Sequence, residues 1–133
     1  MLACASAHVG HSAAHVLGAR YHIPHGAACA WSLPSTIRFI AGACPEKIAY
    51  VGTLLGVDFQ GDETPDAIGF MTAQAYKAFC ERIGMTSFAP EKPDETMLHE
   101  LAHRIAHEPL ASLSPIPVNE ANILPLIHNL FNM

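Results

Sequence analysis

Glycine and proline residues divide this sequence into segments of helix length, and this spacing constrains the possible folds more than any other feature. The strict alternation of apolar and polar residues that is typical of strands is absent. Apolar residues instead recur at intervals of three and four, as they do along one face of a helix. The sequence therefore predicts an all-α fold, a helical bundle in which residues 1–133 form a single helical domain.

Local start and stop signals divide the chain into six expected helices. They run from about residue 2 to 17, 26 to 40, 45 to 56, 65 to 83, 94 to 108 and 120 to 131. Pro45 and Pro65 suit the first turn of a helix, where no amide hydrogen is needed, and Gly18 suits the position just after a helix. Pro34 and Pro125 fall inside two of the segments, and we expect Pro34 to bend or split its helix and Pro125 to kink its helix.

Polar caps and apolar stripes indicate how these helices begin and which faces they bury. The expected caps are Thr64 and Asn119. The expected stripes comprise Ile48, Val51, Leu54 and Leu55 in the third helix, Ile68, Met71, Ala75 and Phe79 in the fourth, and Leu98, Leu101, Ala102, Ile105 and Ala106 in the fifth. The second helix is apolar nearly all round, which predicts burial.

Composition argues against several classes of function. Only 14% of the 133 residues are charged, the formal net charge is −5 and no basic run occurs, so we expect no nucleic-acid partner. The four cysteines are scattered without a C-x-x-C pair, which favours reduced thiols. No segment approaches the roughly 20 apolar residues of a membrane span, and the first residues lack the pattern of a signal peptide. We therefore expect a soluble, cytoplasmic protein without membrane contact.

Four of the nine histidines lie within residues 10–26, in the run GHSAAHVLGARYHIPHG. They are His11, His15, His22 and His25, and a fifth, His8, lies just before them. At about 100° per residue, His8, His11 and His15 fall within about 60° of one another on a helix. Gly18 should end that helix. The run therefore predicts a face of imidazole side chains at the start of the chain.

The short connection after this helix could return His25 to the same face, since Pro24 suits the start of the next helix. Neutral imidazole is a common ligand of zinc, iron, copper and nickel. His8 and His15 lie roughly 10 Å apart along the helix axis and should not share one ion. The plausible pairs are His11 with His15 and His11 with His25. A packed or surface role for each histidine is the alternative.

This run resembles the signature of the iron-type (group III) alcohol dehydrogenases. That signature is H-x-x-x-H-x-L-G followed by P-H-G, with its last histidine fourteen positions after the first, and the matching residues are His11, Ala14, His15, Leu17, Gly18, Pro24, His25 and Gly26. The related glycerol dehydrogenases and dehydroquinate synthases space their two metal histidines more widely, so the spacing favours the alcohol dehydrogenase branch. The resemblance implies the later part of that family's helical, metal-binding domain.

The resemblance also implies a chemistry, which is hydride transfer between a small alcohol or aldehyde and NAD(P), assisted by Fe²⁺ or Zn²⁺. In that family the first and last histidines of the run ligate the catalytic metal, and here these are His11 and His25. The middle histidine, here His15, lies beside substrate and nicotinamide and is the candidate catalytic residue. His22 lies outside the motif, and we expect it to have a surface role.

Two features of that family have no counterpart in this sequence. The glycine-rich turn for the pyrophosphate, G-x-G-x-x-G, is absent. The other two metal ligands of the family, an aspartate and a histidine, come from helices before the first residue here. We therefore expect a fragment that does not oxidise alcohols alone. The alternative is a stand-alone, non-catalytic helical module that binds metal or a partner. Exposed apolar surface predicts a homo-oligomer, such as a dimer.

A second row of histidines, His99, His103 and His107, repeats at intervals of four residues. Pairs of these residues could chelate a metal. The row lies roughly 90° to 170° from the middle of the inward face of its helix, which predicts that it faces solvent. We expect this row to have no catalytic role, although it could bind nickel or zinc in vitro.

Overall fold

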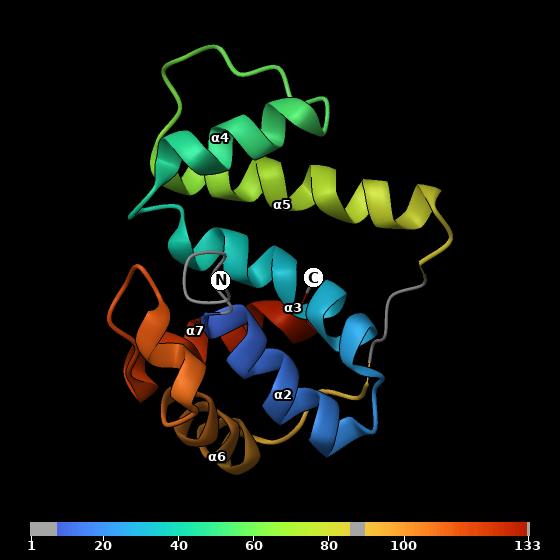
Figure 1. The fold of residues 1–133 in the computed structure, drawn as a ribbon, viewed down its shortest axis with the longest axis vertical. Helices are drawn as coiled ribbons and strands as arrows, with labels where there is room; N and C mark the ends of the chain where they lie inside the picture. The colour runs from blue at the N-terminus through green and yellow to red at the C-terminus, as the bar shows by residue number, and fades with distance from the viewer. Residues whose placement is uncertain (1–7, 86–89, 133) are drawn as a thin grey trace. The chain divides into compact units, whose positions relative to one another are not determined.

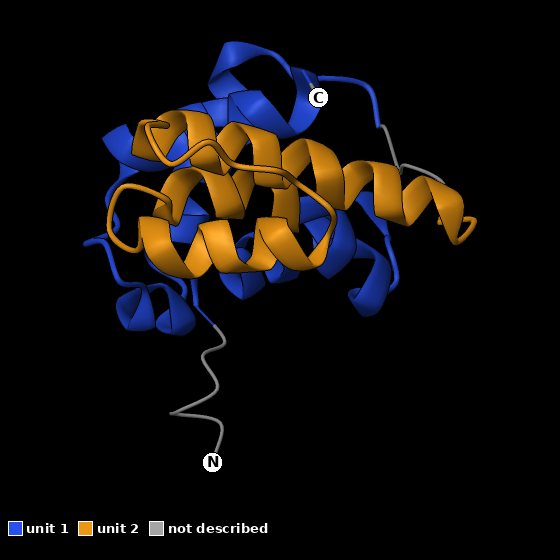
Figure 2. Cartoon of the chain, turned by 90° about the horizontal axis from the view of Figure 1, so that it is seen from above, with its two compact units in different colours: residues 1–32, 88–133 blue, residues 33–87 orange. Residues whose placement is uncertain are grey.

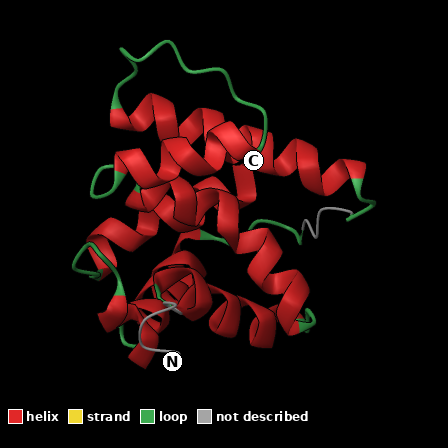
Figure 3. Cartoon of the chain, turned by 45° about the horizontal axis from the view of Figure 1, so that its top comes forward, coloured by secondary structure: helices red, strands yellow, loops and turns green. Residues whose placement is uncertain are grey.

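The computed structural model describes residues 8–85 and 90–132, and every regular element in these ranges is a helix (Figure 1). The elements are α2 (Val9–Tyr21), α3 (His25–Ile40), α4 (Pro45–Leu54), α5 (Pro65–Arg82), α6 (Glu95–Ala106), the short 3₁₀ helix η1 (Pro109–Leu113) and α7 (Glu120–Asn132). The chain divides into two compact units, which are coloured separately in Figure 2. The all-α prediction is confirmed for the described residues, in which no strand occurs (Figure 3).

The first unit comprises the described residues 8–32 and 90–132. In it α6 packs against α7, and α2 packs against both α6 and η1. The core is aliphatic, and its fully buried side chains include Leu17, Leu98, Leu101, Ile105, Ile123 and Ile127. The inward face predicted for the fifth helix is therefore confirmed, except that Ala106 is only partly buried.

The second unit comprises the described residues 33–85, in which α4 packs against α5. Small residues form this contact. Gly52 of α4 is buried, and a Cβ atom on it would lie 2.5 Å from Oγ1 of Thr72 and 2.8 Å from the ring of Phe59. The Thr72 hydroxyl donates a hydrogen bond to the carbonyl of Ile48 at 3.3 Å. The backbones of the two helices therefore approach closely, with no room for a larger side chain at Gly52.

This close approach explains why the predicted apolar stripes of α4 and α5 were partly wrong. In α4, Ile48 is buried, but Val51 is 40% exposed and Leu54 is 69% exposed. The buried residues of α5 are Gly69, Thr72 and Ala73, and the predicted stripe residue Phe79 is exposed. Small side chains take the contact face because only they allow helices to pack this closely, and the larger apolar residues lie beside it.

The first helix differs from its prediction at both ends. His8 is its N-cap, and its side chain accepts a hydrogen bond from the amide of Gly10 at 3.5 Å, so His8 is not on the helical face. The helix does not end at Gly18 but continues to Tyr21, where His22 adopts a left-handed conformation with φ of 55°. The predicted part before His8 lies outside the described residues.

Two internal prolines do not break their helices, contrary to one of the outcomes we expected. Pro34 lies within the continuous α3, and Pro125 lies within the continuous α7. Burial of α3 is confirmed for residues 34–37, although Leu33 is partly exposed. Proline at an interior position removes a single backbone donor, and packing of the surrounding helix outweighs that loss.

The predicted caps are confirmed in detail. The hydroxyl of Thr64 accepts a hydrogen bond from the amide of Ala67 at 3.2 Å. The side chain of Asn119 accepts one from the amide of Asn122, and the side chain of Asn122 accepts one from the amide of Asn119, both at 2.9 Å. This reciprocal pair satisfies two amides that would otherwise have no partner at the start of α7.

Other predictions concern membrane spans, thiols and domains. Among the described helices, none is both long and apolar enough to span a lipid bilayer. Cys29, Cys44 and Cys80 are free thiols, and Cys4 lies outside the described residues. The assignment of residues 1–133 to a single helical domain stays a prediction.

The glycine contact between α4 and α5 yields a stability prediction. Replacing Gly52 with alanine forces Thr72 or Phe59 to move, and such overpacking costs about 1–3 kcal/mol. Alanine also favours the helix by up to about 1 kcal/mol. We therefore expect Gly52→Ala to lower the free energy of unfolding by about 1–2 kcal/mol in urea titrations followed by circular dichroism.

A matched control is Gly42→Ala, since a Cβ atom at Gly42 meets nothing within 4 Å. This variant should unfold within about 0.5 kcal/mol of the wild-type chain. Equal stability of the Gly52 and Gly42 variants would contradict the close contact described for the second unit.

Candidate metal centre

A tight reversal between α2 and α3 builds the histidine cluster. The amides of His22 and Ile23 both donate to the carbonyl of Gly18, which turns the chain at the end of α2. A Cβ atom on Gly18 would lie 3.2 Å from Cβ of Ala28, so glycine at this position lets the start of α3 approach α2. The hydroxyl of Ser32 then donates to the carbonyl of Gly10 at 3.0 Å and joins the two helices further along.

The reversal brings together the three histidines that the sequence singled out. The ring centroids of His11 and His25 are 5.4 Å apart, those of His15 and His25 are 5.4 Å apart, and those of His11 and His15 are 5.9 Å apart. His11 is partly buried, whereas His15 and His25 are exposed at the edge of the cluster. The three rings therefore form one cluster on the first unit, which solvent reaches at His15 and His25.

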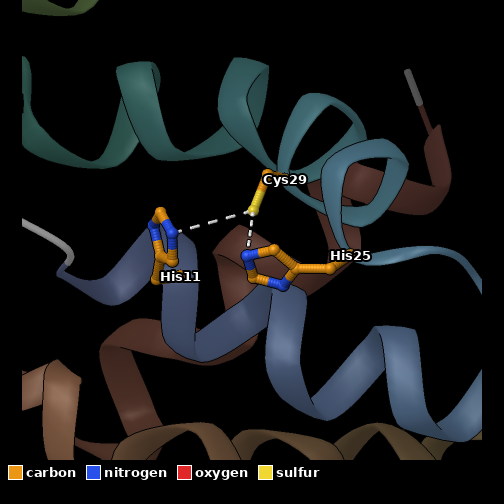
Figure 4. A group of neighbouring side chains, drawn as sticks. All are labelled: His11, His25 and Cys29. Atoms are coloured by element: carbon orange, nitrogen blue, oxygen red, sulfur yellow. Dashed lines mark hydrogen bonds between the residues drawn. The ribbon is translucent and has the colours of Figure 1, made fainter.

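Cys29 completes a group of three possible metal ligands with His11 and His25 (Figure 4). Its Sγ atom lies 3.6 Å from Nε2 of His25 and 3.9 Å from Nε2 of His11. Partial burial raises the pKa of the Cys29 thiol, which keeps it protonated in the absence of a cation. Sequence reasoning missed this residue, although its position four residues after His25 on the same helix was an available signal.

Glu108 anchors His15 from a distant part of the sequence. Nδ1 of His15 lies 3.0 Å from one carboxylate oxygen of Glu108. The other oxygen accepts hydrogen bonds from the hydroxyl of Ser12 at 2.7 Å and from the amide of Leu110 at 2.9 Å. Partial burial alone would raise the pKa of Glu108, but the hydrogen bonds from His15, Ser12 and Leu110 outweigh it and hold that pKa below its ordinary value. No local signal indicated Glu108, which is 93 residues from His15.

The two other histidines of the run lie outside this cluster. His8 caps α2, and burial together with the nearby charge of His11 lowers the pKa of its ring. His22 is exposed at the left-handed residue that ends α2, which agrees with the predicted surface role. The cluster is therefore formed by His11, His15 and His25.

The second histidine row is exposed along α6, as predicted. Nδ1 of His103 lies 2.7 Å from a carboxylate oxygen of Glu120, and Nδ1 of His107 lies 2.8 Å from the carbonyl of His103. A hydrogen bond from His103 and the charges of nearby histidines lower the pKa of Glu120. His103, His107 and Glu120 could together hold a cation, and Glu120 was not anticipated because it comes from α7. All three residues of this surface cluster are exposed.

Comparison with known proteins identifies the class of protein. Residues 1–131 match the sequence model of the Fe-containing alcohol dehydrogenase family, C-terminal. The chain therefore belongs to the iron-containing alcohol dehydrogenase family, and its helical fold is that of the family's C-terminal domain.

The similar proteins are named as enzymes that act on 1,3-propanediol. The chain is 44% identical over 57 residues to a 1,3-propanediol dehydrogenase of Klebsiella pneumoniae and 42% identical over 57 residues to one of Citrobacter freundii. Each alignment covers 43% of this chain and 15% of the relative. A solved 1,3-propanediol oxidoreductase superimposes with a TM-score of 0.74 at 27% identity, over 93% of this chain and 32% of that one. The chain thus spans only part of the length of these relatives.

The donor atoms present fit a divalent transition metal. Two imidazole nitrogens and one sulfur are grouped within 4.8 Å of one another. Imidazole suits zinc, iron, copper and nickel, and thiolate suits the softer of these ions. The family's metal therefore has a chemically suitable place on this chain, at His11 and His25.

The anchor of His15 gives a pH-dependent prediction. Glu108→Gln should lower the free energy of unfolding at pH 7 by about 1–2 kcal/mol, because a neutral amide forms weaker hydrogen bonds to Ser12 and His15 than a carboxylate does. The folded-state pKa of Glu108 lies below its ordinary value of 4.5, so its stabilisation is complete above about that pH. The stabilisation is lost as pH falls through the lowered folded-state pKa, so the difference between variant and wild type should shrink in acid.

Urea titrations at a series of pH values from neutral to acidic would measure this difference. Glu100→Gln is the control, since Glu100 is an exposed carboxylate on α6 and its loss should change stability by less than about 0.5 kcal/mol. A Glu108→Gln difference that stays constant with pH would contradict the proposed ionised anchor.

Proposed function

We propose that this chain is the metal-binding part of an iron-type, NAD(P)-linked alcohol dehydrogenase, which interconverts alcohols and aldehydes by hydride transfer. The observation that carries this proposal is the grouping of the His11, His15 and His25 rings at the reversal between α2 and α3, with ring centroids 5.4 to 5.9 Å apart. Membership of the iron-containing alcohol dehydrogenase family supports it.

In this proposal His11 and His25 hold the divalent ion, which is Fe²⁺ or Zn²⁺. Their Nε2 atoms both lie within 4 Å of the Cys29 sulfur, so both nitrogens are oriented towards one space. Such an ion acts as a Lewis acid that lowers the pKa of an alcohol and polarises a carbonyl. Glycine at position 18 and the Ser32 hydrogen bond keep the two histidines on adjoining helices and so set their separation.

His15 is the proposed catalytic residue. With Glu108 ionised, Nδ1 of His15 donates to that carboxylate, which leaves Nε2 as the basic nitrogen. Because the ring is partly exposed beside His11 and His25, Nε2 can accept or return the hydroxyl proton of a bound substrate. Glu108 acts as a positioning residue, since its second oxygen is held by Ser12 and Leu110.

We propose that the nicotinamide cofactor is bound by residues outside this sequence, which has no G-x-G-x-x-G turn. Short-chain diols are the first substrates to test, because the relatives are 1,3-propanediol dehydrogenases. We expect the chain alone not to oxidise these alcohols. We also propose that this dehydrogenase is soluble and cytoplasmic.

A specific observation favours a second candidate function, a non-catalytic module that binds metal or pairs with another copy of itself. Several large apolar side chains of the second unit are exposed, including Tyr50, Val51, Leu54, Phe70, Phe79 and Ile83. Exposed apolar patches favour association. We therefore propose a homo-oligomer, which is compatible with either candidate function.

Metal content tests the proposed centre. The chain would be purified without an affinity tag, loaded anaerobically with Fe²⁺ or Zn²⁺, dialysed and measured by elemental analysis. We expect about one retained equivalent, which His11→Ala and His25→Ala should each remove because each variant lacks one of the two imidazole ligands. The double variant His103→Ala/His107→Ala removes the surface cluster and should keep this ion.

His22→Asn is the matched control within the histidine run, because asparagine tolerates the left-handed conformation of residue 22. It should retain the metal of the wild type. A chain that holds no ion after loading, or one that loses its ion only in the surface double variant, would overturn the proposed centre.

A further inference from the structure

We propose that Cys29 is a third ligand of the metal, so that His11, His25 and Cys29 form a His₂Cys centre on this chain. The inference rests on the proposed function of His11 and His25 as metal ligands. It goes beyond the sequence motif, which does not include Cys29. The main evidence is that the sulfur of Cys29 lies close to both imidazole nitrogens, 3.6 Å from Nε2 of His25 and 3.9 Å from Nε2 of His11.

These separations agree with those of ligands around one tetrahedral ion. Zinc–nitrogen bonds of about 2.0–2.1 Å and zinc–sulfur bonds of about 2.3 Å, at tetrahedral angles, place nitrogen and sulfur about 3.6 Å apart. The observed distances of 3.6 and 3.9 Å from the sulfur to the two nitrogens are close to this value. Without an ion, the thiol forms weak hydrogen bonds with both imidazoles at these distances, and these bonds keep the three donor atoms grouped (Figure 4).

The fold holds these three donors in place before any ion is bound. His25 and Cys29 are four residues apart on α3, so their side chains lie on the same face of that helix. His11 approaches from α2, which Ser32 ties to α3 through the Gly10 carbonyl. Cys29 is partly buried and lies near both imidazoles, which come from adjoining helices. The three donor atoms are therefore grouped before an ion binds.

A sulfur ligand changes which metal this chain should prefer. Thiolate selects Zn²⁺ and similarly soft ions over harder ones, so a His₂Cys set favours Zn²⁺ over Fe²⁺. On coordination the thiol loses its proton to solvent and its sulfur forms the bond to the ion. Three protein donors would leave an ion able to accept a further donor, such as a substrate oxygen or a side chain from elsewhere.

Cobalt substitution tests the sulfur ligand directly. Co²⁺ would be titrated into the full chain carrying His103→Ala/His107→Ala, so that the surface cluster does not contribute. We expect visible ligand-field bands together with a near-ultraviolet sulfur-to-cobalt charge-transfer band, both lost on addition of Zn²⁺. Cys29→Ser should abolish the charge-transfer band and weaken cobalt binding by at least about tenfold, since even outer-shell substitutions weaken metal binding by about 10–100-fold. Cys80→Ser, on α5, is the control and should retain both signals.

The outcomes separate this inference from the proposed function. Ligand-field bands that need His11 and His25, without any charge-transfer band in the parent chain, would overturn the role of Cys29 and leave the histidine site intact. Cobalt signals that do not depend on His11 or His25 would overturn both proposals. A charge-transfer band that persists in Cys29→Ser would assign the sulfur to another cysteine.

A second measurement does not require the serine variant to fold. Alkylation of Cys29 and Cys80 by iodoacetamide would be followed by mass spectrometry with and without Zn²⁺. Zinc should slow the alkylation of Cys29 at least about tenfold, because a coordinated sulfur is shielded from the reagent, and should leave Cys80 unchanged. The protection should disappear in His25→Ala. Equal rates at Cys29 with and without zinc, under conditions where the metal is bound, would contradict the inference.

Discussion

The close approach of α2 and α3 at Gly18 is the constraint on which the functional geometry depends. With Cβ absent at residue 18, Ala28 can pack at the turn, and the left-handed His22 lets the chain reverse within a few residues. The Ser32 hydrogen bond to Gly10 then holds the helices together beside the histidines. His11 and His25 are fourteen residues apart in the sequence, and this reversal is what brings their rings together.

Contacts with later parts of the chain hold His15, the third histidine of the cluster. Glu108, beyond the end of α6, lies 3.0 Å from Nδ1 of His15 and accepts a hydrogen bond from the hydroxyl of Ser12. Packing of α2 against α6 and η1 brings that carboxylate to the cluster. The second half of the unit therefore orients the ring of His15, while the first helices determine where that ring lies. This division explains how residues far apart in sequence can serve one site.

Local signals in the sequence predicted the features that local physics determines. The caps at Thr64 and Asn119 follow from short-range hydrogen bonds, and the histidine spacing predicted the convergence of His11 and His25. Glu108 and Glu120 could not be anticipated, because their partners depend on the packing of separate helices. The end of the first helix was misplaced because Gly18 serves close packing rather than termination.

The contact between α4 and α5 was misjudged for a related reason. Periodicity identifies where large apolar residues lie, but helices that touch through Gly52 and Thr72 leave Leu54 exposed. A pattern of hydrophobicity does not report how closely two backbones approach. Small residues at helical spacing carry that information, and they are easily overlooked because their side chains bury little area.

The most direct test of the account is the position of the ion itself. Crystals of the zinc-loaded chain would give an anomalous difference map from data collected on either side of the zinc absorption edge. We expect a peak within bonding distance of both His11 and His25 at the reversal between α2 and α3. A peak found only beside His103, His107 and Glu120, with none at the reversal, would contradict the claim that this turn builds the metal centre.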